Sequence, residues 1–101
     1  MTRPVRLQLR RSKGFDLQAM SVAINGLPAR KVTRPGPWGN PFPIAPDRTA
    51  AQAVAMAGDH FRAELKRNPD LLEPLRGHNL ACWCAPGTPC HADLLIELAN
   101  R

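Results

Sequence analysis

The sequence predicts a single α/β domain, in which two to three helices flank a small mixed or mostly parallel sheet. Three observations support this prediction. Apolar residues alternate with polar ones near the N-terminus, a short apolar run lies between Gly77 and Pro86, and longer segments carry apolar residues at helical spacing. A chain of 101 residues is long enough for one modest core and too short for two, so residues 1–101 are expected to fold as one unit.

The N-terminal third is predicted to supply most of the strands. Alternation of apolar and polar residues predicts a first strand at residues 5–10, with one buried face and one strongly basic face. Two further strands are predicted at residues 21–24 and 30–33. The Asn25-Gly26 pair between them favours a hairpin turn, because both residues tolerate positive φ.

A last strand is predicted at residues 80–84, because this apolar run is short and stops at Pro86-Gly87. Side chains alternate along a strand, so Cys82 and Cys84 are expected on one face and Trp83 on the other.

Caps and apolar spacing predict three helices. They are expected from Asp47 or Thr49 to about Arg67, from Asn68-Pro69 to Gly77, and from His91 to about Asn100, with Cys90 at the cap of the last one. A strand, a tight loop and a helix would then follow one another at the C-terminal end. That order places Cys90, His91 and free backbone N–H groups at the carboxyl end of the 80–84 strand, where open α/β sheets bind ligands.

Positive charge is concentrated near the N-terminus. The whole chain has a net charge of +6, whereas residues 1–36 alone carry eight Lys and Arg against one acidic residue. This distribution favours a nucleic acid or a phosphorylated small molecule as partner, with Arg10 and Arg34 as the anion contacts. A basic surface that only solubilises the protein is the alternative interpretation.

Cysteine usage indicates a reducing compartment. The three cysteines are odd in number, no charged-then-apolar leader begins the chain, and no apolar run is long enough to span a membrane. We therefore expect a cytoplasmic protein with free or metal-bound thiols and no membrane association. Nothing in the sequence predicts its oligomeric state.

The proline-rich segment from Arg34 to Pro43 is predicted to be an ordered, rigid loop. Trp38 and Phe42 offer apolar anchors, and Asn40 is held extended by the proline after it. Two interpretations are open. The loop either packs against the edge of the sheet, or forms the wall of a ligand site with Trp38 and Asn40.

Three short motifs together resemble a known family. They are Trp38-Gly39-Asn40-Pro41-Phe42, Cys82-Trp83-Cys84 and Cys90-His91-Ala92-Asp93. In this combination the chain resembles a small bacterial and phage family known as domain of unknown function 4326, and the resemblance covers nearly the whole chain. It implies a small α/β domain and supplies no established activity.

The cysteine cluster has three interpretations. In the first, Cys82, Cys84, Cys90 and His91 are the ligands of a metal, for which this donor set suits tetrahedral zinc. In the second, Cys82 and Cys84 are inert buried residues, and Cys90 only caps a helix.

In the third interpretation, the cluster is the active site of a small enzyme acting on a nucleotide or modified base. Cys90 is then the nucleophile, activated by the helix N-terminus, with His91 as acid or base and Asn40 as a polar orienter. Alternatively, the backbone N–H groups at the start of this helix form a phosphate site with Arg10 and Arg34. Asp93, in the first turn of that helix, is either a ligand contact or a carboxylate that stabilises the helix.

Overall fold

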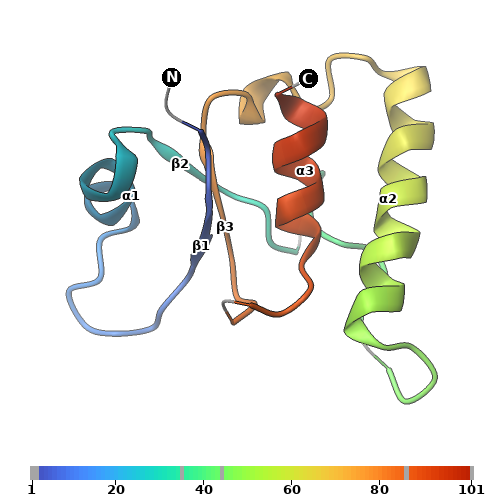
Figure 1. The fold of residues 1–101 in the computed structure, drawn as a ribbon, viewed down its shortest axis with the longest axis horizontal. Coiled ribbons are helices and arrows are strands. Elements are labelled where there is room, and N and C mark those ends of the chain that lie inside the picture. Colours follow the sequence, from blue (N-terminus) through green and yellow to red (C-terminus); the bar gives the residue numbers. More distant parts are fainter. Residues whose placement is uncertain (1–2, 35, 44, 86, 101) are drawn as a thin grey trace.

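The computed structural model describes residues 3–34, 36–43, 45–85 and 87–100. Its strands form one parallel sheet with the order β1-β3-β2, and its helices lie on both faces of that sheet (Figure 1). The elements are β1 (Arg6–Gln8), α1 (Leu17–Asn25), β2 (Ala29–Lys31), α2 (Ala50–Arg67), the 3₁₀ helix η1 (Glu73–Leu75), β3 (Asn79–Cys82) and α3 (His91–Ala99). The predicted α/β class, with a small parallel sheet and flanking helices, is confirmed.

Strand β3 occupies the middle of the sheet. All four of its residues are buried, as expected for a parallel strand that is covered on both faces. Leu80 lies opposite Arg6 of β1 and Arg30 of β2. Because the three strands run in the same direction, the residues that follow them meet at one edge of the sheet.

The two faces of the sheet bury separate apolar clusters. On one face, Leu7, Leu9 and Ala81 pack with residues around α1. On the other face, Leu80 and Cys82 pack with α2, α3 and η1, and α2 rests against α3 in an outer layer (Figure 1). The alternation predicted for the first strand is confirmed at positions 7 and 9, although the observed strand is shorter.

The predicted hairpin at residues 21–33 is wrong, because residues 21–24 belong to α1. The Asp16 side chain caps this helix by accepting a hydrogen bond from the Ala19 N–H at 3.0 Å. Gly26 ends it with φ 77° and donates its N–H to the Val22 carbonyl. The tolerance of Gly26 for positive φ therefore serves a helix C-cap instead of a hairpin turn.

The strand predicted at residues 30–33 is observed at Ala29–Lys31, where it pairs with β3 in parallel. β3 itself ends at Cys82, two residues earlier than predicted.

The helix predictions are confirmed for α2 and α3. Thr49 is the N-cap of α2 and forms a capping box with Gln52, and Cys90 is the N-cap of α3. The short helix predicted after Asn68 is reduced to η1. Among the described residues, no helix has both the length and the apolarity needed to cross a bilayer.

A buried polar network joins the start of β3 to α1 and β1. The Asn79 carboxamide, fully buried, donates to the Ser21 hydroxyl at 2.7 Å and accepts from the Val5 N–H at 2.9 Å. It also exchanges two hydrogen bonds with the Asn25 carboxamide. This network holds β3 in register at the edge opposite the cysteines.

We therefore expect Asn79→Ala to lower the free energy of unfolding by about 1–3 kcal/mol, because the truncation leaves buried partners without hydrogen bonds. Chemical denaturation would measure the loss. Ser12→Ala, at an exposed position, is the control. A loss no larger than that of the control would contradict the role of the network.

Candidate metal centre

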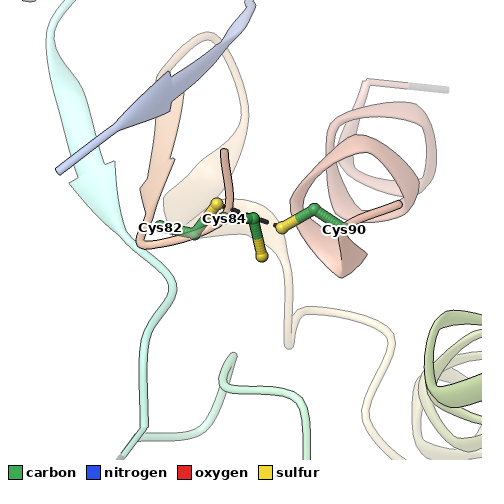
Figure 2. A group of neighbouring side chains, drawn as sticks. All are labelled: Cys82, Cys84 and Cys90. Carbon is green, nitrogen blue, oxygen red and sulfur yellow. Dashed lines mark hydrogen bonds between the residues drawn. The ribbon is translucent and has the colours of Figure 1, made fainter. Parts of the chain in front are cut away.

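Three sulfur atoms converge at the carboxyl edge of the sheet (Figure 2). Cys82 ends β3, Cys84 lies in the following loop, and Cys90 caps α3. The three Sγ atoms lie within 4.8 Å of one another, and those of Cys82 and Cys90 are 3.0 Å apart. Tetrahedral zinc holds sulfurs about 3.8 Å apart, since each Zn–S bond is about 2.3 Å long. Small side-chain rotations therefore bring this cluster to the spacing of a zinc site.

The thiols share their protons unequally. A hydrogen bond from Cys82 lowers the pKa of Cys90 to about 3, and His91 acts in the same direction, against the opposing effect of burial. The same hydrogen bond, together with burial, raises the pKa of Cys82. Burial also raises the pKa of Cys84, and the charge of Arg6 partly offsets this effect. Without metal, one negative charge is therefore concentrated on Cys90.

Arg6 fixes the loop that carries the cysteines. Its guanidinium donates to the carbonyl oxygens of Thr88 at 2.8 Å and Ala85 at 3.2 Å, and it lies 3.2 Å from the Asp93 carboxylate on α3. Only 11% of the Arg6 side chain is exposed. One residue of β1 thus ties together both ends of the loop and the helix that follows. In the sequence, Arg6 is recognisable only as part of a basic face, since its partners are about 80 residues away in the chain.

His91 anchors the start of α3. Its Nε2 donates to the carbonyl oxygens of Val32 at 2.7 Å and Trp38 at 3.0 Å, so this nitrogen carries the hydrogen. Nδ1 lies 3.8 Å from the Cys90 sulfur. His91 therefore stands beside the three-sulfur group, and Nδ1 is the nitrogen left for the predicted role as ligand or base.

The proline-rich loop does reach the cluster, through the Trp38 carbonyl that His91 binds. The Trp38 indole N–H donates to the Leu71 carbonyl at 3.0 Å, which anchors the loop to the segment after α2. A Cβ on Gly39 would lie 2.7 Å from Arg34 Cγ, so the loop packs this closely only with glycine there.

Asn40 holds the same loop with both ends of its carboxamide. Nδ2 donates to the Ala53 carbonyl of α2 at 3.3 Å, and Oδ1 accepts from the Phe42 N–H at 2.8 Å. These contacts support the packing interpretation of the loop.

An open cavity of about 510 Å³ lies in front of the sulfurs. Six of the predicted site residues line it, namely Cys82, Cys84, Cys90, His91, Asn40 and Arg34. The other three predicted site residues are not among the described residues that line this cavity. Arg10 is exposed beyond β1, Trp38 packs against the core, and Asp93 pairs with Arg6.

Trp83 also lines the cavity, although it is not among the site residues predicted from the sequence. Alternation along the predicted strand placed Trp83 on the face away from Cys82 and Cys84, and so gave no reason to assign it to the site. The observed strand ends at Cys82, so this alternation does not extend to Trp83, of whose surface 49% is exposed.

We expect Arg6→Met to lower the free energy of unfolding by about 1.5–3 kcal/mol, because two carbonyl groups lose a charged donor. Asp93→Asn is the matched control. It removes only a partner whose side chain is 61% exposed, so the loss should stay below about 1 kcal/mol. Thermal or chemical denaturation would compare them. Equal losses would show that the ion pair, and not the carbonyl contacts, holds the loop.

The metal-free, reduced protein should contain one thiolate at pH 6. An ordinary cysteine, with a pKa of about 8.5, is protonated at this pH, whereas the lowered pKa keeps Cys90 ionised until the pH falls toward 3. Ultraviolet thiolate absorbance would measure this charge, and Cys90→Ser should abolish it at pH 6. A signal in the wild type that appears only above pH 8 would contradict the assigned proton distribution.

The chain has a short match to a phage protein. The chain is 53% identical over 30 residues to an uncharacterised 12.4 kDa protein in the nrdA-td intergenic region of Enterobacteria phage T4. The match covers 30% of this chain and 27% of the phage protein. No solved structure matches significantly. A family model described as domain of unknown function (DUF4326) matches residues 7–101, and the chain therefore belongs to this family.

Proposed function

We propose that this chain is a cytoplasmic zinc-binding domain whose metal site forms the floor of a groove for nucleic acid or a nucleotide. The observation that carries the metal assignment is the convergence of three cysteine sulfurs within 4.8 Å. Thiolates are ligands that zinc prefers, and a reducing compartment keeps such close cysteines from forming a disulfide.

The metal would be held by Cys82, Cys84 and Cys90, with the cavity on its open side. Among the described residues, the group of possible ligand atoms that lie within 4.8 Å of one another consists of these three sulfurs, which favours a site of three protein ligands with an exchangeable fourth position. Nδ1 of His91, near Cys90, is the protein atom that would otherwise complete the site.

The groove, which is the open cavity in front of the three sulfurs, is suited to a phosphorylated partner. Arg34 lines it, and the described residues 3–34 carry eight Lys and Arg against Asp16 alone. Such a concentration of positive charge attracts phosphate groups over several ångströms. The proposal of a nucleic-acid or nucleotide partner rests on this positive charge.

Elemental analysis of protein purified without chelators or metal resins should find about one zinc per chain. Cys90→Ser should lose most of the zinc and lower the melting temperature, because binding energy at a structural metal site contributes to folding. His78→Ala, which removes a histidine preceding β3 at the opposite edge, should retain the metal. A folded wild-type protein that contains no zinc, and takes up none when zinc is added, would contradict the proposal.

A second candidate is an enzyme that uses Cys90 as nucleophile with His91 as acid or base. It is favoured by the 3.8 Å separation of Sγ and Nδ1 and by the position of both side chains on the cavity wall. The substrate would be a nucleotide or modified base. Zinc analysis separates the candidates, because the enzyme candidate uses a Cys90 thiolate without a bound metal.

A further inference from the structure

Trp83 is unusual in being both large and exposed. Of the large hydrophobic side chains with high exposure among the described residues, it is the only aromatic one, at 49%. It does not belong to either apolar cluster, yet it lines the cavity, as do its sequence neighbours Cys82 and Cys84. An exposed indole at the rim of a groove is available to an incoming ring.

Arg11 holds this indole in place. Its guanidinium carbon lies 5.0 Å from the centroid of the Trp83 ring, within the range of a cation–π contact. The contact restricts the ring without burying it, and it brings a positive charge next to the aromatic surface.

The topology places further charge on both sides of Trp83. The three strands are parallel with β3 in the middle, so the segments after β1, β3 and β2 emerge in that order along one edge (Figure 1). Arg10 and Arg11 follow β1, Trp83 follows β3, and Arg34 follows β2. β1 and β2 are two strand spacings apart, about 10 Å. The neighbouring carboxylate of Asp93 is neutralised by Arg6.

We infer that this edge binds single-stranded nucleic acid, with one base stacked on Trp83 and the flanking phosphates near Arg10 and Arg11 on one side and Arg34 on the other. The inference rests on the nucleic-acid part of the proposed function and names its partner. A duplex hides the faces of its bases, whereas a single strand exposes them to aromatic side chains. A polynucleotide supplies phosphates on both sides of a base, which a mononucleotide does not.

Fluorescence anisotropy with a labelled eight-nucleotide oligo(dT) tests the inference on the full chain as purified. Trp83→Ala should weaken binding roughly 5- to 150-fold, the usual effect of losing one base–aromatic stack, whereas Trp83→Phe should retain most of the affinity. Because Trp83 is half exposed, both variants should keep the wild-type circular dichroism spectrum. Unchanged affinity in Trp83→Ala would overturn the stacking role.

Charge variants test the phosphate contacts. Arg34→Gln should reduce the slope of log affinity against log salt by about 0.7, the value for one phosphate contact on a single strand. Arg67→Gln, at the C-terminal end of α2, is the charge-matched control and should leave the slope unchanged. Equal slopes in wild type and Arg34→Gln would remove Arg34 from the site.

The choice of ligand separates failure of this inference from failure of the proposed function. Tighter binding of oligo(dT) than of its duplex with oligo(dA), or of dTMP, at equal salt supports a single-stranded partner. If dTMP or the duplex binds as tightly as oligo(dT), the single-strand inference fails while the proposed groove stands. If none of the three binds at low salt, the nucleic-acid part of the proposed function fails as well.

Discussion

The parallel pairing of β3 between β1 and β2 is the constraint on which the rest of the structure depends. A central strand of four buried residues needs cover on both faces, and the crossover helices α1 and α2, with α3, supply it. The same pairing sends the residues after each strand to one edge. The cysteines, the proline-rich loop and the basic N-terminal segment meet there for that reason, although they are far apart in the chain.

Two polar side chains then hold this edge together. Arg6 donates hydrogen bonds to backbone carbonyl groups of the loop that contains Cys84. His91 donates to a carbonyl group just after β2 and to one in the proline-rich loop. Both reach across the fold from elements that are themselves held by the sheet and its core. The three sulfurs thus lie close together in the folded chain, which favours ionisation of Cys90 and would reduce the entropy lost if a metal were bound.

Local signals predicted the parts of the fold that local chemistry controls. The N-cap at Thr49, one of the two predicted caps of α2, the cap at Cys90 and the alternation at Leu7 and Leu9 all depend on neighbours within a few residues. The hairpin prediction failed because positive φ at Gly26 suits a helix end as well as a turn. Packing of Leu17 and Met20 of α1, and of the preceding Phe15, on the sheet decided between these two uses.

The sequence by itself determined the composition of the candidate site: three cysteines and a histidine within ten residues, at the last predicted strand and at the start of the last helix. Only the tertiary structure decided which partners these groups have. His91 Nε2 is engaged by Val32 and Trp38, Arg6 is bound to the cysteine loop, and Trp83 is held by Arg11. Backbone carbonyls and side chains from distant segments make these contacts, and their positions follow from strand order, which residue spacing does not encode.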